Sequence, residues 1–577
     1  MTLLKKILRY PTGTVFVVGA LLFIITAVIT YPIITGFSTI LPGVGDVYTY
    51  LWGLWWFMYA IVHLHMLPFV TDMQFYPQHI NISQDLSVVH GLLSLPIAYV
   101  WGPVAAYNFV LFFTFIITGV GFYIFLKSIV RNNYAAFFGT FIFTFSYGRL
   151  YRALVGQLDI ASTEWMGFIL YFLFQLFIRR KYTQNNVFGA ALFLGLTAYT
   201  EYRNLFYMIL FTAVFIPLSA VIHFWQDDHN DRKINFLKML GSSITLVLAT
   251  NAFIFPLLLV NLHKIGDVQY APTYPPFNAN ALSFFLLPCD VLLSRIIGWC
   301  YWPAIFEGRL VYFGMIPVLL TLLYVTRRVA VLEKRVVYIY SGCLIVFTVF
   351  SLGTQTLFYQ IFFNNVLLFK VMRVSSRLTV LAEISLALFS ALGLEYIAHR
   401  LKHKPWRWVI YLIIVAVATL EIWPFNMKYT DVRKIPEKHL SVIKNDIGIS
   451  MLEIPFGFRG NIYESFGSHE TEMSFYYQMK HHVPIIGGYM SMLDWAAWVN
   501  IKQDTLLQKL IDCQTHKRCE PMTEDEKSRF IMVYKVRYVT FLNRKYSHME
   551  KYLLDMFALT KLYDDGSVTV WGKIADM

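Results

Sequence analysis

The chain has 577 residues, of which 57% are hydrophobic and only 14% are charged. A soluble protein has about 25% charged residues, so this composition excludes a water-soluble globular enzyme, a disordered chain and a fibrous protein. The formal net charge is +13, which in a membrane protein usually reflects basic cytoplasmic loops rather than nucleic-acid binding. Five cysteines are too few for a disulfide scaffold or a metal cluster.

The first apolar run extends from Thr12 to about Ile34 and follows the basic residues Lys5, Lys6 and Arg9. A membrane-spanning helix needs roughly 20 apolar residues. The run is longer than the core of a signal peptide and no small-residue cleavage site follows it, so we expect a retained first span. Its basic flank predicts a cytoplasmic N-terminus.

Later apolar runs bring the expected number of spans to about eleven. They cover 105–126, 134–150, 163–178, 187–201, 204–225, 238–261, 310–326, 336–352, 378–398 and 407–424. With strict alternation, every dense short basic loop falls on the cytoplasmic side, as the positive-inside rule requires. These loops contain Lys127 and Arg131, Arg179 to Lys181, Arg232 and Lys233, Arg327 to Arg335, and Arg400 to Arg407.

Two further apolar stretches, 47–64 and 86–102, are expected to lie on or dip into the outer surface. One more crossing at either stretch would place all later basic loops on the wrong side of the membrane. Prolines and glycines also interrupt this region, as expected of short interfacial pieces. They are Pro68, Pro77, Pro96, Gly91 and Gly102.

The chain changes character at about Met427, where charged residues become frequent and apolar runs shorten. We therefore expect a transmembrane module at 1–427, with a first external loop at 35–104, and a mixed α/β domain outside the membrane at 428–577. Within that domain we expect a helix at 524–534 and strands at 449–455, 536–542, 560–563 and 567–572, the last two joined in a hairpin. Cys513 and Cys519 lie in this compartment, where a disulfide between them is one of two open alternatives.

The first candidate site follows the first span, in the stretch Gly45 to Tyr50. Asp46 could act as a general base or hold a divalent cation. The alternative is that Asp46 only caps the helix that follows it.

The second candidate is the stretch Gly156 to Trp165 between the third and fourth spans. Ser162 or Thr163 could cap the next helix, with Glu164 favourable in its first turn. That alternative leaves Gln157 and Asp159 free to face a pocket.

The remaining candidates are charged residues at span ends. Glu201 and Arg203 lie in a tight turn next to hydrocarbon, where either a mutual ion pair or a functional role explains them. Arg373 and Arg377 lie on the predicted outer face, against the bias of the other basic groups. Arginine forks bind phosphate oxygens, so we favour an anionic ligand there over contact with lipid headgroups.

Several known kinds of site are missing from the sequence. It has no phosphate-binding glycine loop of the ATPases or dinucleotide enzymes, which argues against an ATP-driven pump. It has no zinc motif and no nucleophile elbow, so His63, His65, His79 and His90 are expected to be isolated hydrogen-bonded residues.

At these positions the sequence resembles the polytopic GT-C glycosyltransferases, in particular the YfhO-like bacterial integral-membrane proteins. The matching stretches are GDVYTYLWGLWW, LLSLPIAYVWGPVAAYNFVLFF, GQLDIASTEWMGFILYFL, AYTEYRN, FKVMRVSSR, LEIPFG and PIIGGYMS. The resemblance implies a polyprenyl-phosphate sugar donor, transfer on the outer side of the membrane, and a catalytic acid in the first external loop, where Asp46 stands. Many members have two acids in that loop and often Gly-His where this chain has Gly156-Gln157, so the metal dependence and the identity of the base stay open.

The fold expected is thus a polytopic α-helical membrane protein with GT-C-like architecture and a small C-terminal α/β domain. The function expected is a glycosyltransferase of the cytoplasmic membrane that moves a sugar from a lipid-linked donor to a glycan, lipid or protein acceptor. Catalysis is assigned to Asp46, Asp159 and Glu201, and sugar contacts to Tyr48, Gln157 and Trp165. Binding of the donor phosphate is assigned to Arg203, Arg373 and Arg377. We also expect Asp46, Arg373 and Arg377 to converge at the outer rim of the helix bundle.

The candidate cofactor is a divalent cation, Mg²⁺ or Mn²⁺, with Asp46 as its ligand. Two other functions stay open: a transporter or flippase of a lipid-linked or anionic substrate, and a noncatalytic membrane assembly protein. Transporters usually have repeated halves and polar groups deep in their spans, whereas here polar groups gather at the outer ends.

Overall fold

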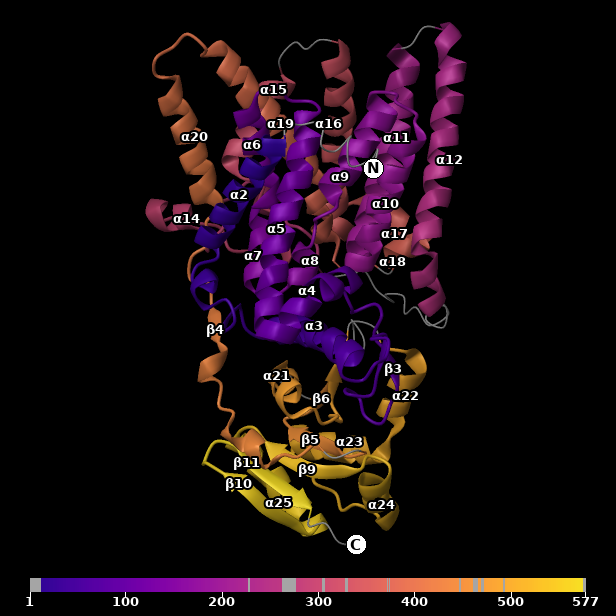
Figure 1. Cartoon of the computed structure of the whole chain (residues 1–577), viewed down its shortest axis with the longest axis vertical. Helices are drawn as coiled ribbons and strands as arrows, with labels where there is room; N and C mark the ends of the chain where they lie inside the picture. The colour runs from indigo at the N-terminus through magenta and orange to yellow at the C-terminus, as the bar shows by residue number, and fades with distance from the viewer. Residues whose placement is uncertain are drawn as a thin grey trace. The chain divides into compact units, whose positions relative to one another are not determined.

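The computed structural model divides the chain into two compact units, each described separately here (Figure 1). Unit 1 contains residues 1–36, 109–259 and 269–428, and unit 2 contains residues 37–108, 260–268 and 429–577. The contacts therefore group most of the first external loop with the C-terminal segment. The structure describes residues 12–573 except 227–228, 262–276, 304–306, 327–330, 371, 373, 446–447, 460–464, 468–471 and 491–492.

Unit 1 is built from apolar helices. In chain order these are α2 (Thr12–Ile29), α5 (Pro103–Lys127, shared with unit 2), α6 (Asn133–Thr144), α7 (Tyr147–Leu154), α8 (Leu158–Ala161), α9 (Met166–Leu173), α10 (Gln184–Thr200), α11 (Tyr202–Gln226), α12 (His229–Val260), α15 (Met315–Val325), α16 (Val331–Ser351), α19 (Thr379–Arg400) and α20 (Arg407–Ile422). Short helices connect them: α14 (Leu292–Ile297), α17 (Leu357–Asn365) and α18 (Leu367–Lys370).

Six helical segments in the described part of the chain are long and apolar enough to cross a membrane. They are 103–127, 158–178, 202–225, 233–260, 334–351 and 375–400. The protein is therefore a mainly helical, multi-pass membrane protein, whereas the expected total of about eleven spans stays a prediction.

The run 134–150, expected as one span, forms two helices. Asn132 caps the first, α6, by accepting hydrogen bonds from the amides of Tyr134 at 2.9 Å and Ala135 at 3.2 Å. The helix ends before Ser146, whose φ of −52° and ψ of 144° are not helical, and α7 begins at Tyr147. The break turns the polar sequence of α7, YGRLYRAL, away from the axis of an apolar span and places its two arginines in the protein interior.

Close helix packing centres on α19. A Cβ added to Gly139 of α6 would lie 2.6 Å from the carbonyl oxygen of Ala387, and one added to Gly393 would lie 2.5 Å from the carbonyl oxygen of Leu320 in α15. Small residues allow helix backbones to approach in this way in membrane proteins. The helix α19 is thereby held firmly between α6 and α15, and so is the turn before it that carries Arg377.

Unit 2 joins the first external loop to the C-terminal segment. Strand β1 (Ile40–Pro42) pairs with β4 (Tyr429–Asp431), and helix α3 (Asp46–Val62) packs on α21 (Glu472–His481). Trp52 of α3 donates a hydrogen bond from Nε1 to Oε1 of Gln478 in α21 at 2.7 Å. The expected surface stretches 47–64 and 86–102 correspond to α3 and to α4 (Val88–Trp101), which have 17 and 14 residues.

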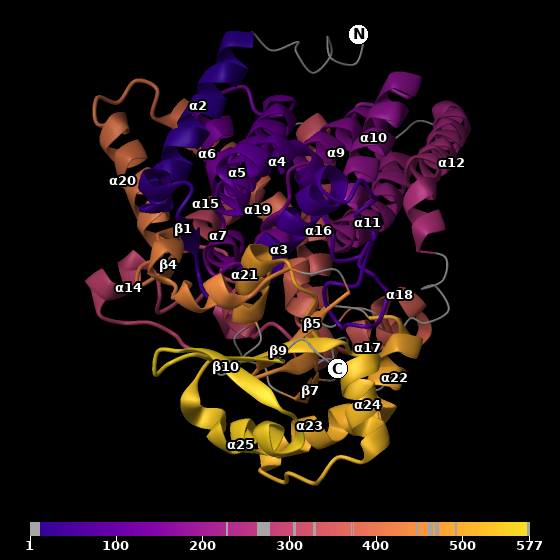
Figure 2. The ribbon, with the colours of Figure 1, turned by 60° about the horizontal axis from the view of Figure 1, so that its bottom comes forward.

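The rest of unit 2 is a mixed α/β fold, which confirms the expected strands, helix and hairpin. A four-stranded sheet has the order β10 (Leu559–Asp564), β11 (Thr569–Lys573), β9 (Val536–Phe541) and β5 (Ser450–Ile454), with β5 parallel to β9. Smaller strands β6 (Gly457–Arg459), β7 (Ser465–Gly467) and β8 (Gly488–Tyr489) form a second sheet. The helices are α22 (Trp495–Gln503), α23 (Thr505–His516), α24 (Glu524–Met532) and α25 (Ser547–Met556), shown from another side in Figure 2.

Two disulfides connect cysteines close in sequence. Cys513 bonds to Cys519, which settles the alternative left open by the sequence, and Cys289 bonds to Cys300, a pair that we did not predict. Cys343, in α16, is free and buried.

Candidate functional site

Asp46 occupies the first turn of α3, in unit 2. Gly45, with a φ of 78°, is the N-cap of this helix and makes no side-chain cap bond. The alternative that Asp46 caps α3 is therefore wrong, although its carboxylate is still favoured by the positive end of the helix dipole. Tyr48, two residues further, is only 3% exposed and packs edge-on against Tyr476.

Three of the predicted site residues meet in unit 1, and we name Asp159, Glu201 and Arg203 the anionic cluster. The Nε of Arg203 donates to Oε1 of Glu201 at 2.7 Å, and its Nη2 donates to Oε2 of Glu201 at 2.9 Å and to Oδ2 of Asp159. The backbone N–H of Arg203 also donates to Glu201, at 3.1 Å. Arg203 is thus paired with two carboxylates, which confirms the ion pair expected as one alternative for this turn.

A second charged group in unit 1 contains Arg377 and two residues that we did not predict, and we name Arg152, Glu307 and Arg377 the cationic cluster. Arg152, from α7, donates to both carboxylate oxygens of Glu307. Arg377, from the turn before α19, donates from Nη2 to Oε1 of Glu307 at 2.9 Å. The Nε of Arg377 is buried without a hydrogen-bond partner among the described residues.

The electrostatics of Glu307 follow from its two guanidinium neighbours. Burial alone would raise the pKa of its carboxyl, but the charges and hydrogen bonds of Arg152 and Arg377 outweigh burial and lower its pKa to about 2. Glu307 is therefore ionised at any ordinary pH, and it holds the two guanidinium groups on either side of one carboxylate.

Tyr207 of α11 is within electrostatic range of residues from both clusters. These residues are Arg152 and Arg377 of the cationic cluster and Arg203 and Glu201 of the anionic cluster. The two clusters therefore lie near one another. Tyr207 is 4% exposed. With two carboxylates and one guanidinium, the anionic cluster has a formal charge of −1. With one carboxylate and two guanidinium groups, the cationic cluster has a formal charge of +1.

The two expected sugar contacts in unit 1 lie beside these clusters. The side-chain oxygen of Gln157 accepts a hydrogen bond from Arg152 at 3.1 Å. The indole N–H of Trp165 donates to the hydroxyl of Thr200 at 2.8 Å, next to Glu201. Both side chains are partly buried, and their role toward a sugar stays a prediction. Arg373 lies outside the described residues.

A sequence signal for the unpredicted arginine was present. Arg149 lies at the end of the run 134–150 and Arg152 just after it, on its predicted outer side, which is the same departure from the positive-inside bias that marked Arg377. Arg149 has a structural role: it donates to the carbonyl oxygens of Ala161 at 2.8 Å, Thr144 and Thr114, and stacks over Phe115 at 4.1 Å. It thereby fixes α7, which positions Arg152.

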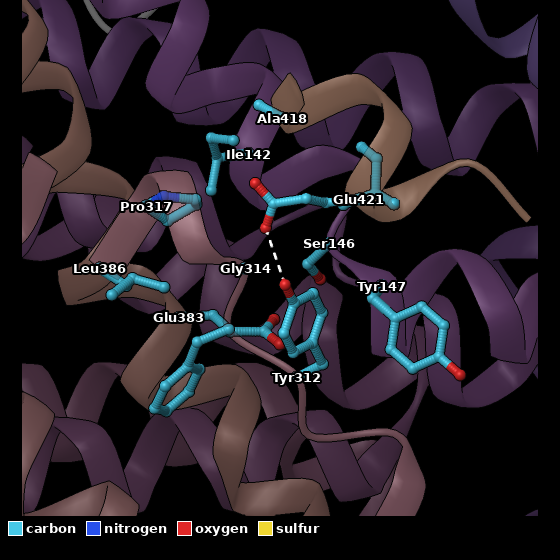
Figure 3. A pocket seen from close by; sticks show the side chains of 12 residues that line it. Ile142, Ser146, Tyr147, Tyr312, Gly314, Pro317, Glu383, Leu386, Ala418 and Glu421 are labelled. Carbon is cyan, nitrogen blue, oxygen red and sulfur yellow. Dashed lines mark hydrogen bonds between the residues drawn. The ribbon is translucent and has the colours of Figure 1, made fainter. Parts of the chain in front are cut away.

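A small cavity of about 10 Å³, enough for about one water molecule, lies further along α7 and α19 (Figure 3). Glu383 and Glu421 line it from opposite sides. The hydroxyl of Tyr312 donates to Oε2 of Glu421 at 2.9 Å, and the amides of Met315 and Ile316 also donate to this carboxylate. Glu421 thus accepts the bonds of the first amides of α15 and joins that helix to the end of α20.

Comparison with solved structures gives two informative matches. The arabinofuranosyltransferase AftD from Mycobacteria has a TM-score of 0.55 and 11% sequence identity; the match covers 98% of this chain, which spans only 42% of that protein. ArnT from Cupriavidus metallidurans, in a structure bound to undecaprenyl phosphate, has a TM-score of 0.53 and 10% identity over 98% of this chain and 99% of that one. No protein-family model matches the sequence, and no curated protein does.

The chain is similar in fold to these two GT-C glycosyltransferases. This confirms the expected architecture, because each match covers nearly the whole of this chain. At this level of identity, the GT-C fold carries no assignment of individual residues.

The described part of the chain contains no group of three or more His, Cys, Asp or Glu side chains arranged to hold a metal ion. In the anionic cluster, the two carboxylates are already paired with Arg203. These residues do not fit a protein-only metal site, so the mechanism below includes no step through a cation. The expected Mg²⁺ or Mn²⁺ stays a prediction.

Proposed function

We propose that this protein is a membrane glycosyltransferase that moves a sugar from a polyprenyl-phosphate donor to a glycan, lipid or protein acceptor on the outer face of the membrane. The observation that carries the proposal is the cationic cluster, in which two arginines share one glutamate inside a GT-C fold. The cationic cluster has one positive charge in excess, and its planar guanidinium groups are already oriented as hydrogen-bond donors. Both properties suit the binding of a phosphate group.

In the proposed reaction, the donor phosphate binds to Arg152 and Arg377 next to Glu307. Glu307 occupies only part of the donor capacity of the two guanidinium groups, and it keeps them apart and in fixed orientations. When the bond between the anomeric carbon and the phosphate oxygen breaks, its electron pair goes to the phosphate. The two guanidinium groups stabilise that developing charge, which is where electrostatic catalysis is most effective.

The acceptor hydroxyl must lose its proton as its oxygen bonds to the anomeric carbon. A carboxylate performs this step as a general base. Asp46 is our candidate because the resemblance to GT-C enzymes implies an acid at that place in the first external loop. Asp159 and Glu201 are carboxylates that can orient the acceptor, and Arg203 holds both of them in place. Arg203 itself, paired with two carboxylates, is a weaker candidate for phosphate than we expected from the sequence.

The outer-face assignment is supported by the cysteines. The bonded pairs Cys289–Cys300 and Cys513–Cys519 both fall in segments predicted to lie outside, whereas the free Cys343 falls in a predicted span. Disulfides persist in oxidising compartments and are rare in the cytosol.

Binding of undecaprenyl phosphate to the purified full chain in lipid nanodiscs tests the phosphate site. Arg377→Gln removes one charged donor, and charged hydrogen bonds contribute about 1.5–3 kcal/mol, so affinity should fall about 10- to 100-fold. Arg433→Gln is the matched control, because Arg433 pairs with Asp431 in unit 2 with its side chain 66% exposed. Unchanged affinity in Arg377→Gln would remove this cluster from the donor site.

Asp46→Asn separates the functions that the sequence leaves open. An enzyme should lose sugar transfer but keep undecaprenyl phosphate binding and membrane insertion. A carrier would instead lose flux of its substrate, and an assembly protein would lose neither activity. Retained transfer in Asp46→Asn would show that Asp46 is not the base.

A further inference from the structure

Residues 281–302 of unit 1, which we name the disulfide loop, form a compact excursion between the long helices. The loop contains a 3₁₀ turn at Ala281–Phe284 and helix α14, and the Cys289–Cys300 disulfide closes its second half. The amide of Tyr301 also donates to the carbonyl oxygen of Leu287 at 2.8 Å, beside the disulfide.

The disulfide loop exposes large apolar side chains near its start and towards its end. Ile296 is 63% exposed, Ile297 56%, Trp299 54% and Trp302 51%, and Leu282 and Phe285 are exposed to a similar extent. Several large apolar side chains exposed close together in the sequence, as at 296–302, indicate contact with another protein or with a membrane.

The loop is anchored firmly to the end of α20. The amide of Leu292 donates to the carbonyl oxygen of Trp423 at 2.8 Å, and the amide of Phe425 donates to the carbonyl oxygen of Asp290 at 3.0 Å. The guanidinium of Arg295 lies over the ring of Phe425 at 5.5 Å. Figures 1 and 2 both show α14 beside this end of α20 and projecting outward from the helices.

Helix α20, to whose end the loop is anchored, also has an exposed apolar face. That helix presents a row of large apolar side chains at its surface: Trp408, Val409, Leu412, Ile413 and Val415. In a multi-pass membrane protein, such a face is covered by lipid tails. The sequence predicts a span at 407–424; α20, with 16 residues, is about 24 Å long, so as a crossing helix it is expected to end near the boundary of a hydrocarbon core about 30 Å thick.

We propose that the disulfide loop is a membrane-interface element: α14 and the residues after it insert Ile296, Ile297, Trp299 and Trp302 into the headgroup and upper acyl region of one leaflet, beside the end of α20. Tryptophan is enriched at this depth because its ring is apolar and its N–H is polar. The exposed Arg295 lies at the level where lipid phosphates are found. The disulfide keeps the segment compact while it is surrounded by lipid. This inference is independent of sugar transfer, because it concerns only lipid contact.

Spin-label depth measurement on the full chain in phosphatidylcholine vesicles tests the proposal. A label is attached at Ile297→Cys or, in a second variant, Trp299→Cys, and its collision rates with oxygen, which concentrates in lipid, and with a water-soluble nickel complex are compared. Leu412→Cys on α20 is the lipid-exposed control, and Glu524→Cys, whose native side chain is 89% exposed in unit 2, is the aqueous control. Labelling of the native chain measures how much spin label the buried free Cys343 takes up.

The proposal expects both loop labels to have an oxygen-to-nickel ratio several-fold above that of Glu524→Cys and somewhat below that of Leu412→Cys. A ratio equal to that of Glu524→Cys would place the loop in water and overturn the proposal. Low collision rates with both reagents would show that protein covers the loop, from a partner or a second copy, and would overturn it equally.

Discussion

The anionic and cationic clusters each contain three side chains of the same two kinds, carboxylate and guanidinium, in opposite proportion. In the first, one guanidinium holds two carboxylates; in the second, one carboxylate holds two guanidinium groups. Both lie around Tyr207. The difference teaches that an arginine near a candidate site is not by itself a phosphate ligand. The number of carboxylates that already pair with it decides whether positive charge is left for a ligand, and only the cationic cluster has such an excess.

The largest expected effect is a loss of sugar transfer, without a loss of phosphate binding, when the anionic cluster is changed. Glu201→Gln removes a charge from the anionic cluster, and we expect sugar transfer to fall roughly 100-fold, as it does when a reacting group is misplaced by about 1 Å. Undecaprenyl phosphate affinity should stay unchanged, because the cationic cluster is intact. Glu526→Gln is the matched control: Glu526 pairs with Lys509 and, like Glu201, its side chain is 7% exposed. If Glu201→Gln lost undecaprenyl phosphate affinity as strongly as it loses sugar transfer, the two clusters would act as one site.

Glu307→Gln should move stability and phosphate affinity in opposite directions. Removing the shared carboxylate leaves two buried guanidinium groups without their partner, which should cost about 3–5 kcal/mol of unfolding free energy. The formal charge of the cluster rises from +1 to +2, so undecaprenyl phosphate should bind at least as tightly as before. Thermal unfolding with and without undecaprenyl phosphate measures both effects. Weaker binding in a folded Glu307→Gln protein would contradict the charge argument.

The same glutamate predicts a pH dependence of stability. The pKa of Glu307 is lowered from 4.5 to about 2 in the folded protein, so its contribution is complete above about pH 4.5 and is lost as the pH falls toward 2. The shift corresponds to roughly 3 kcal/mol. The difference in thermal stability between the native protein and Glu307→Gln should therefore shrink between pH 6 and pH 3. An unchanged difference would mean that Arg152 and Arg377 do not hold the carboxylate ionised.

The smallest effect is expected at the edge of the cationic cluster. Gln157→Ala removes the single hydrogen bond from Arg152 at 3.1 Å. A bond of this kind contributes about 1 kcal/mol, so undecaprenyl phosphate affinity should fall about fivefold. A loss as large as that in Arg377→Gln would assign Gln157 a direct contact with the lipid phosphate.

Local patterns in the sequence predicted local structure well. The hairpin across Asp564, Asp565 and Gly566 and the short helices α3 and α4 follow from turn residues and from interruptions in apolar runs. Asp159, Glu201 and Arg203 were also predicted, because charged residues at the ends of apolar runs are costly and therefore informative.

Pairing across long distances in the chain could not be predicted in the same way. Glu307 bonds to Arg152 and Arg377, which are 155 and 70 residues away, and no motif surrounds Glu307. The break between α6 and α7 was missed because the run 134–150 is apolar throughout its first half. The grouping of residues 37–108 with the C-terminal segment depends on packing such as Trp52 on Gln478, 426 residues apart.

The most direct test of the central claim is an experimental map of the full chain in nanodiscs with undecaprenyl phosphate bound. The account predicts phosphate density within about 2.7–3.2 Å of the guanidinium groups of Arg152 or Arg377, with Glu307 still between them. Phosphate density beside Arg203 alone, or away from both clusters, would contradict it.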